Sequence, residues 1–324
     1  MSTFLSPFLP KTGSFFLASL NNRVFASIIL FTSGITFFCA TKKQKAGIKT
    51  LSKKLKVTLI VVAIILFLII AFCGYKIITL SNRYKTDREA YDKLREEYAQ
   101  TVERPDAGNE DLTGNEIEDG ESEEYWVYND GEYDDSPVYV NFNAIQEKVN
   151  PEIVAWIKCE GTKIDYPVVH HTDNNYFLNH NANGDYAAAG AIFMSASNFS
   201  DFSDINTTIH GHHMNDGSMF GSLWTWGNQE YFDQHKVFYL NTPNGNYTIT
   251  MIAYIVVPED SDAYKIDFSG NNDVRNWVNW IMSESKVQSD YTYREGERYV
   301  GLSTCEYTFK NARGILIGYL TPLG

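Results

Sequence analysis

Tyr247–Val257, which reads YTITMIAYIVV, is the longest strand-like run in the chain and decides the fold class. Its β-branched and aromatic residues suit a pleated, partly buried surface, and the Asn and Gly residues before it favour a turn. Many short strands of this kind, separated by turns, predict a mainly β domain built as a barrel or a sandwich. The other runs of this composition are Lys163–Val169, Gly190–Met194, Thr207–His210, Val237–Leu240, Arg298–Ser303 and Gly314–Leu320.

Two stretches of this domain are predicted to be helical. Asn141–Asn150, followed by Pro151–Trp156, is interpreted as short helical structure. A second helix begins near Asn272 or Asp273, either of which can cap it. Its apolar residues recur at helical spacing and form one face. These residues are Val274, Trp277, Val278 and Ile281.

Three features of the domain carry chemistry. Cys305 stands at the end of a strand-like run, in LSTCE, where a rigid scaffold can present its side chain. His210–Gly217 reads HGHHMNDG and follows another strand. Arg313 lies eight residues after Cys305. A thiolate is the reactive form of Cys, nearby cations such as His212 and Arg313 lower its pKa, and His can pass a proton to a leaving amine.

Structural roles are also open for the same residues. A Cys at a strand end is often a small buried hydrophobe, and Cys159, after a strand-like run, fits that description. A Cys159–Cys305 disulfide is a further possibility. The histidines could hold zinc, but neighbours on a strand point to opposite faces, and neither HExxH nor CxxC is present. No metal ligand is therefore assigned.

Taken together, the motifs resemble the class B sortases over about residues 138–324. The family pattern TLxTC matches Gly301–Cys305 (GLSTC) except for its opening Thr. The class B stretch GHH-M-x-D-G-x-M-F-G matches Gly211–Gly221, with His210 in place of the usual preceding Tyr. Asn141–Val168 is also of class B style, and the helix near Trp277 falls where these enzymes carry an extra helix.

This resemblance implies a closed β-barrel with N-terminal helices, an extra helix between late strands and an N-terminal membrane anchor. It implies a cysteine transpeptidase with Cys305 as nucleophile, His212 as general acid and base, and Arg313 as positioner of the substrate and the oxyanion. His212 is chosen over His213 because the family's catalytic His follows the Gly directly. Substrate or oxyanion contacts are expected from Ser303, Thr304 and Glu306.

The implied partners are surface proteins or pilins that carry a sorting motif. The acceptor amine would come from a peptidoglycan precursor or a pilin lysine, and no cofactor is expected. Two other functions stay open at this point. A chymotrypsin-like cysteine protease also has His before Cys on a β-barrel, although Arg313 and the TCE sequence fit it poorly. The second open function is that of a non-enzymatic, wall-anchored adhesin or pilin-like subunit.

Charge divides the chain, whose 324 residues carry a formal net charge of −13. Residues 1–104 are net +10, residues 105–135 are net −13 without any Lys or Arg, and residues 136–324 are net −10. The acidic balance argues against a protein that reads nucleic-acid phosphates. Four cysteines are too few for a disulfide-stapled scaffold. The domain is therefore bounded at 136–324, with differently charged segments before it.

The two segments before the domain are predicted to be a linker and a stalk. Residues 105–135 form an acidic, Gly-containing linker that lacks the register of an EF-hand calcium loop. Residues 74–104 form a helical stalk, since Lys76–Arg104 has no Gly or Pro. An apolar stripe on this helix could pack on the following domain or on a partner. It consists of Tyr84, Tyr91, Leu94 and Tyr98.

Residues 57–73, VTLIVVAIILFLIIAFC, contain no charge and are predicted to be a transmembrane anchor. A buried core helix and a cleaved signal peptide are the alternatives, but no A-x-A cleavage site follows Cys73. A lysine block precedes the span, so the preceding loop is placed in the cytoplasm and the domain outside the cell. The block consists of Lys42, Lys43, Lys45, Lys49, Lys53, Lys54 and Lys56.

Residues 1–56 hold a further pattern. Leu9–Gly13 reads LPKTG and is followed by a weaker apolar run, Val24–Ala40, and then by the lysine block. This order resembles a Gram-positive cell-wall sorting signal, which normally ends a protein. If Val24–Ala40 also spans the membrane, Met1–Arg23 lie outside. The alternatives are a chance match and a natural start of translation near Leu51.

Overall fold

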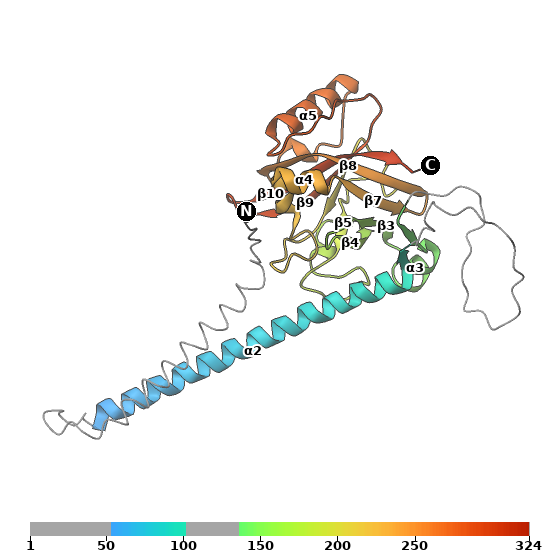
Figure 1. Cartoon of the computed structure of the whole chain (residues 1–324). Coiled ribbons are helices and arrows are strands. Elements are labelled where there is room, and N and C mark those ends of the chain that lie inside the picture. The colour runs from blue at the N-terminus through green and yellow to red at the C-terminus, as the bar shows by residue number, and fades with distance from the viewer. Residues whose placement is uncertain (1–52, 102–135, 324) are drawn as a thin grey trace, which may run out of the picture. The chain divides into compact units, whose positions relative to one another are not determined.

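The computed structural model describes residues 53–101 and 136–323 (Figure 1). The LPKTG motif, the possible span at Val24–Ala40 and the acidic linker therefore lie outside the described residues, and those predictions stay untested. The chain divides into two units, Met1–Cys73 and Gly74–Gly324, and each is described by itself.

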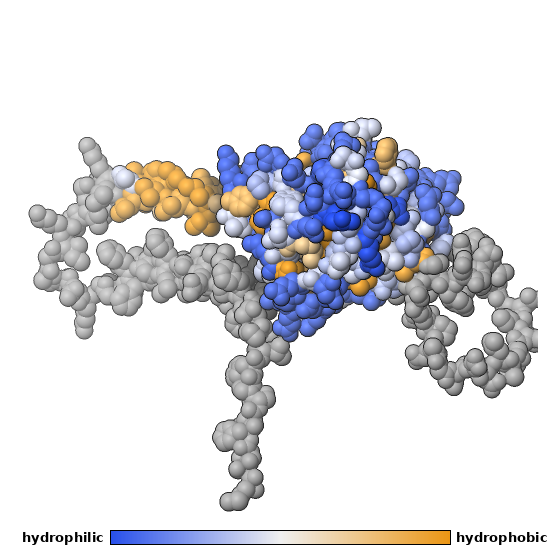
Figure 2. All heavy atoms as spheres, turned by 90° about the horizontal axis from the view of Figure 1, so that it is seen from above, coloured by the Kyte–Doolittle hydropathy of each residue, from blue (hydrophilic) through white to orange (hydrophobic). Residues whose placement is uncertain are grey.

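In the first unit, the described residues belong to the start of helix α2 (Lys53–Tyr98). Its apolar side chains from Val57 to Phe72 are exposed, with Phe67 70% accessible. They form one continuous hydrophobic surface in Figure 2, whereas the visible face of the second unit is mostly hydrophilic. Within the described part of the chain, α2 is the one helix long and apolar enough to cross a membrane.

The second unit is built on a closed eight-stranded barrel with strand order β10-β8-β7-β3-β4-β5-β6-β9 (Figure 1). Neighbouring strands are antiparallel except for the pairs β4–β5 and β6–β9, which are parallel. Every strand predicted from composition is present, and the mainly β fold class is confirmed. The strands are β3 (Ile153–Lys158), β4 (Asp165–His170), β5 (Ile192–Met194), β6 (Asn206–His210), β7 (Val237–Thr242), β8 (Gly245–Pro258), β9 (Tyr299–Glu306) and β10 (Ala312–Pro322).

Strand β8 is apolar along most of its length because both of its faces are covered. Met251 and Tyr254 belong to the core inside the barrel, whereas Ile252 and Ile255 belong to a second apolar cluster on the outside. Helix α5 (Asn271–Glu284) covers that outer face. Its buried residues are the predicted face, Val274, Trp277, Val278 and Ile281.

The predicted cap of this helix is wrong. The N-cap is Gly270, and it makes no side-chain capping bond. The Asp273 carboxylate instead pairs with Lys265 at 2.8 Å and accepts a hydrogen bond from the backbone N–H of Ser269. Asp273 therefore lies in the first turn, where its charge also favours the helix N-terminus.

The prediction of helix at Pro151–Trp156 is also wrong. Helix α3 (Phe142–Lys148) is present, and the Asn141 side chain caps it by accepting from the Ala144 N–H at 3.0 Å. The chain then enters β3, whose β-branched residues suit a strand and which pairs with β4 and β7. Ladder bonds on both sides and burial on the barrel interior outweigh the local helical tendency.

The end of the stalk differs from its predicted boundary. Helix α2 ends at Tyr98 instead of Arg104, because Ala99–Thr101 (β1) pairs antiparallel with Val138–Val140 (β2). Four short elements complete the described part of this unit. They are the 3-10 helices η1 (Tyr176–Leu178), η2 (Leu223–Gly227) and η3 (Asp262–Tyr264), and helix α4 (Gln229–Gln234).

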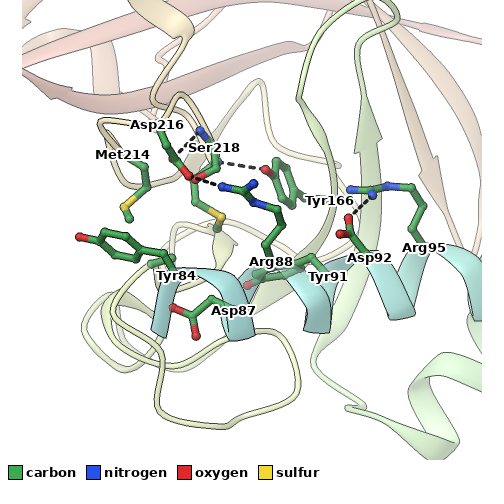
Figure 3. A pocket seen from close by; sticks show the side chains of 12 residues that line it. Tyr84, Asp87, Arg88, Tyr91, Asp92, Arg95, Tyr166, Met214, Asp216 and Ser218 are labelled. Atoms are coloured by element: carbon green, nitrogen blue, oxygen red, sulfur yellow. Dashed lines mark hydrogen bonds and ion pairs between the residues drawn. The ribbon is translucent and has the colours of Figure 1, made fainter. Parts of the chain in front are cut away.

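The predicted stripe of the stalk packs on the barrel domain. Tyr91 and Leu94 are each 4% exposed, and the Tyr91 ring meets the Tyr166 ring edge-on with centroids 5.4 Å apart. Arg88 of the same helix reaches Asp216 at 2.8 Å (Figure 3). Between the two possibilities left open by the sequence, the stripe contacts the following domain.

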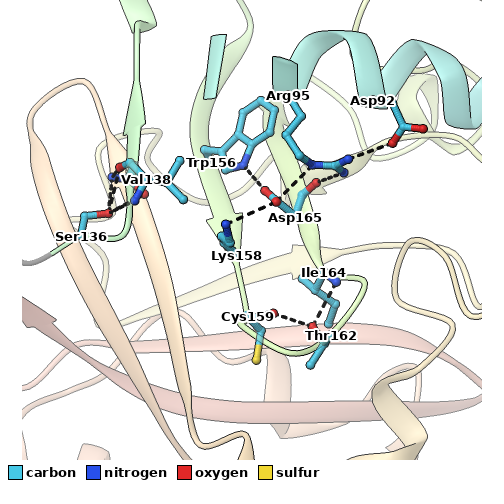
Figure 4. Close-up of polar contacts among 11 residues, drawn as sticks. Asp92, Arg95, Ser136, Val138, Trp156, Lys158, Cys159, Thr162, Ile164 and Asp165 are labelled. Atoms are coloured by element: carbon cyan, nitrogen blue, oxygen red, sulfur yellow. Dashed lines mark hydrogen bonds and ion pairs between the residues drawn. The ribbon is translucent and has the colours of Figure 1, made fainter. Parts of the chain in front are cut away.

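Asp165 joins the last turn of α2 to the barrel wall (Figure 4). Its carboxylate accepts a hydrogen bond from the buried Trp156 Nε1–H at 2.7 Å. The same carboxylate pairs with Arg95 Nε at 3.1 Å and lies 3.7 Å from Lys158 Nζ. One side chain therefore satisfies an indole N–H and neutralises two cations.

Replacement of Asp165 by Ala is expected to lower the free energy of unfolding by about 2–4 kcal/mol, because it leaves the buried Trp156 N–H without its acceptor and takes one carboxylate away from Lys158 and Arg95, of which Arg95 still pairs with Asp92. Urea unfolding followed by Trp fluorescence measures this. The matched control is Asp233→Ala, which breaks the more exposed pair with Lys236 and is expected to cost about 0–1 kcal/mol. Equal losses in the two variants would contradict a linking role for Asp165.

Candidate active site

Cys305 and Arg313 face each other across two neighbouring strands. They are register partners in the antiparallel pair of β9 and β10, and both are partly exposed. Directly opposed residues project to the same face of a sheet, with Cβ atoms about 4.5–5.5 Å apart. The strand pairing therefore fixes a thiol beside a guanidinium.

Glu259, one residue beyond the end of β8, orients the guanidinium. Its Oε2 accepts from Arg313 Nη2 at 2.8 Å, and its Oε1 accepts from Asn311 Nδ2 at 2.6 Å. Arg313 Nη1 also donates to the carbonyl of Ala312 at 3.2 Å. An Arg side chain has five N–H donors in a planar fork, so it can be held by these groups and still donate to a ligand.

His212 follows strand β6, which runs parallel to β9 and pairs His210 with Ser303. Gly211 is fixed at both of its backbone groups, since its N–H donates to the Ser303 carbonyl at 3.1 Å and its carbonyl accepts from Thr304 Oγ1 at 2.8 Å. The next residue is thereby held beside the end of β9, where Cys305 lies.

The ring of His212 has a defined partner. Its Nε2 lies 2.6 Å from the carbonyl oxygen of Leu178, at the end of η1. A carbonyl can only accept, so the Nε2 atom carries the proton and donates it. Neutral His212 is then left with its lone pair on Nδ1, which can take up a proton from a reacting group.

His213 points elsewhere. Its Nδ1 lies 2.9 Å from the carbonyl oxygen of Cys305, and its ring meets the Tyr307 ring edge-on. It therefore holds the backbone at the end of β9 and leaves His212 as the histidine of this pair that faces the open groove.

A groove of about 530 Å³ runs over these residues. It is lined by Cys305, His212 and Arg313, and by Ser303 and Thr304 beside them. Its other walls come from η1, β5, β6 and the η3 region. They are formed by Asn174, Leu178, Phe193, Ser195, Ser197, Asn198, Thr208, His210, Gly211, Glu259, Tyr264 and Ile266.

The three neighbouring residues expected at the substrate are already engaged. Ser303 is 2% exposed, and its hydroxyl lies 2.8 Å from that of Tyr264. The Thr304 hydroxyl donates to Gly211, as described above. Glu306 is not a lining residue of the groove, and its carboxylate accepts from the Thr308 N–H at 2.7 Å. The geometry brings Ser303 and Thr304 to the groove but not Glu306.

Both Cys159 and Cys305 are free thiols, so the disulfide considered between them is not formed. Cys159 is 2% exposed, and burial raises the pKa of its thiol to about 12. It is therefore an unreactive, buried side chain, as its place in the sequence suggests.

Known proteins were compared with this chain at the level of sequence. No protein-family model matches it. Sortase B of Listeria monocytogenes is 31% identical over 176 residues, which cover 54% of this chain and 72% of the relative. The chain belongs to the sortase B family. Sortase B of Staphylococcus aureus is 26% identical over 253 residues, which cover 78% of this chain and 91% of the relative.

Solved structures agree with this membership. Sortase B of Bacillus anthracis in complex with AAEK2 superposes with a TM-score of 0.58 at 28% identity, covering 74% of this chain and 97% of the other. A sortase B complexed with triglycine has a TM-score of 0.54 at 26% identity, covering 56% and 86%. This sortase B is a cysteine transpeptidase, so the chymotrypsin-like protease and the non-enzymatic surface protein are excluded.

His210 gives this sortase B a groove wall that departs from the family's usual Tyr. Its ring stacks on Tyr264 with centroids 6.1 Å apart and lies 5.2 Å from that of Phe193. Burial, with a smaller contribution from Arg313, lowers the pKa of His210 to about 4. His210 is therefore neutral near pH 7, and the permanent positive charge next to Cys305 in the groove is that of Arg313.

Three groups of this candidate site are not indicated by any sequence motif. Tyr264 and Glu259 come from the region between β8 and α5, and no motif marks them. Leu178 acts through its backbone carbonyl, 34 residues before His212, so its side chain carries no signal. For Glu259, the sequence offers one hint: it is an acidic residue close after the strand-like run that ends at Val257.

Replacement of Gly211 by Ala is expected to lower kcat by about 10–100-fold, because a small displacement of His212, the expected general acid and base, is costly. A Cβ there would lie 2.5 Å from Ile192 Cδ1 and 2.7 Å from Phe220 Cδ2, both in fully buried side chains, so the chain before His212 must shift. Steady-state peptide cleavage measures the effect. The control is Gly245→Ala. A Cβ added there would meet no atom within 4 Å, although the positive φ of Gly245 makes this substitution strained as well. Unchanged kcat in Gly211→Ala would contradict the tight placement.

Proposed function

We propose that Cys305, His212 and Arg313 are the catalytic residues of this transpeptidase, and that it acts from the outer face of a membrane on proteins with a C-terminal sorting motif. The observation that carries the proposal is the pairing of Cys305 with Arg313 across β9 and β10, in the groove that His212 also lines. Thiol, cation and proton carrier then converge on one ligand-sized space.

In the first half-reaction, the thiolate of Cys305 attacks the carbonyl carbon of the scissile peptide bond. A C–S bond forms, and negative charge develops on the carbonyl oxygen. Arg313, held by Glu259, donates N–H groups to that oxyanion. Protonated His212 gives its Nδ1 proton to the departing amine as the C–N bond breaks, while its Nε2–H stays on the Leu178 carbonyl. A thioester remains on Cys305.

In the second half-reaction, a primary amine attacks the thioester carbonyl. The amine loses a proton to His212, the C–S bond breaks, and Cys305 leaves as a thiolate. The product is a new amide bond, and the enzyme returns to its starting state. The complex of a related sortase B with triglycine supports a glycine amine as acceptor, as in a peptidoglycan precursor. A pilin lysine is the second candidate.

Membrane anchoring is proposed through Val57–Cys73. Its side chains are exposed along the described helix, and a single uncharged apolar helix of this length suits a bilayer core. The lysine block before it supports an orientation with the catalytic domain outside the cell. Protease added to intact cells is expected to digest the catalytic domain. Full protection of this domain would contradict the orientation.

A peptide-library cleavage assay with the full chain in detergent tests the function. Peptides with sorting motifs, LPKTG among them, are offered together with triglycine or with a lysine-containing pilin peptide. The expected result is cleavage within the motif and transfer of the N-terminal fragment to one of the two amines. Hydrolysis of unrelated sequences without transfer would contradict the proposal. The preferred amine separates wall anchoring from pilus assembly.

A further inference from the structure

Gly190, at the end of the loop of residues 179–191, lies directly against His212. Its φ is +60°, and a Cβ on this residue would stand 2.6 Å from the Phe177 carbonyl oxygen, 2.9 Å from that of Leu178 and 3.1 Å from His212 Cδ2. The next residue, Ala191, donates its N–H to the Phe177 carbonyl at 2.9 Å. The Nε2–Cδ2 edge of the His212 ring therefore faces both the Leu178 carbonyl that it bonds and the neighbouring Gly190.

Helix α2 fixes this loop through Tyr91. The hydroxyl of Tyr91 donates to the carbonyl of Gly190 at 2.8 Å and accepts from the Ala182 N–H at 3.3 Å. One turn earlier, Asp87 is buried, and this burial raises the pKa of its carboxyl, while the nearby Ala189 amide offsets part of the rise. The stalk thus bonds backbone groups at 182 and 190, toward the two ends of one loop, through the Tyr91 hydroxyl.

The same face of α2 also contacts the loop that follows His212. Arg88 pairs with Asp216 at 2.8 Å, and the Tyr91 ring packs edge-on against Tyr166, whose hydroxyl accepts from the Met219 N–H at 3.1 Å (Figure 3). Both chain segments that flank the His212 ring therefore rest on one helical face.

We propose that Tyr91 is a positioning residue for His212, acting through Gly190, so that the stalk helix influences the geometry of the site through this one side chain. The inference rests on the proposed role of His212. If the Tyr91 hydroxyl is lost, the Gly190 carbonyl loses its donor and the loop is free to move away from His212. The contact that keeps the ring against the Leu178 carbonyl is then weakened, and the proton is delivered from a less favourable position.

A purely structural role would give a different result. If Tyr91 only docked the helix, its ring would supply that packing, and Tyr91→Phe would keep it. The hydroxyl, by contrast, bonds only backbone groups of the loop beside His212, as far as the described residues go. Its removal therefore separates positioning from docking, because the helix and the core below it keep their shape.

The test compares Tyr91→Phe with Tyr84→Phe in the full chain in detergent micelles. Tyr84 lies two turns earlier on the same helix and lines the same small pocket (Figure 3), but its hydroxyl has no hydrogen bond among the described residues. Titration of His212 is followed by NMR of ¹³Cε1-labelled histidines. The resonance of His212 is assigned by its loss in the His212→Gln variant. Steady-state kcat and KM for a sorting-motif peptide are measured on the same preparations.

For Tyr91→Phe we expect kcat to fall about 5–30-fold with KM within about twofold, and the His212 titration midpoint to move by at least ~0.3 pH units. Tyr84→Phe is expected to match the wild type in both. Asp87→Asn, which removes the charge of the buried carboxylate one turn earlier, is expected to move the same readouts less far. A Tyr91→Phe variant that behaves like Tyr84→Phe in kcat and titration would overturn the proposal.

The two proposals fail in distinguishable ways. If the wild type turns over no sorting-motif peptide, the proposed function fails, but the His212 titration still tests the action of Tyr91 on the ring. If the peptides are cleaved and the titration is the same in all variants, only the positioning role of Tyr91 is lost. Thermal unfolding of each variant confirms that the compared proteins are folded.

Discussion

Cys305→Ala is expected to lower sorting-peptide cleavage by about a thousandfold or more, since its sulfur forms the thioester in the proposed mechanism. The side chain is partly exposed and lines the groove, so its replacement removes the nucleophile without opening a cavity in the core. Fluorescence-quenched peptides measure the loss. Appreciable turnover by this variant would show that another group attacks the substrate.

Cys159→Ala is the matched control for this prediction. Cys159 is the other described cysteine of the barrel domain, and it is buried with a raised thiol pKa. Its loss is expected to lower stability slightly and to leave kcat within about twofold, because a buried protonated thiol is a poor nucleophile. The contrast between the two variants separates loss of the nucleophile from loss of a thiol in general.

Arg313→Lys is expected to lower kcat by about 100-fold, a typical effect of losing an oxyanion donor. Lys keeps the charge but lacks the planar fork, so it cannot be held by Glu259 and donate to the oxyanion in the same geometry. Steady-state cleavage of the same peptides gives the value. Arg294→Lys is the control, since Arg294 is 63% exposed and pairs with Glu297 away from the groove. Near-normal kcat in Arg313→Lys would argue against its oxyanion role.

The sequence predicted most of the barrel because its strands are bounded by turn residues and enriched in β-branched and aromatic side chains. It failed at β3, where Pro151 and the preceding helix favoured continued helix. Only pairing with β4 and β7, which come later in the chain, makes Ile153–Lys158 a strand. The stalk boundary was missed for the same reason, since β1 exists through its pairing with β2, 37 residues or more away.

The site was predictable where chemistry resides in side chains and short motifs. Cys305, His212 and Arg313 follow from the resemblance, and the structure brings them to one groove. Leu178 was not predictable, because it contributes a carbonyl oxygen that any residue would supply. Glu259 and Tyr264 lie in a segment without a motif, and only the closure of the barrel brings them to Arg313 and Ser303.

Intact-protein mass spectrometry of the acyl-enzyme tests the central claim most directly. The full chain is mixed with a sorting-motif peptide without an acceptor amine, quenched in acid, and digested to locate the modification. The account predicts an adduct with the mass of the N-terminal peptide fragment on Cys305, which triglycine or a lysine amine removes as a new peptide product. Turnover without an adduct on Cys305, or an adduct on another residue, would contradict it.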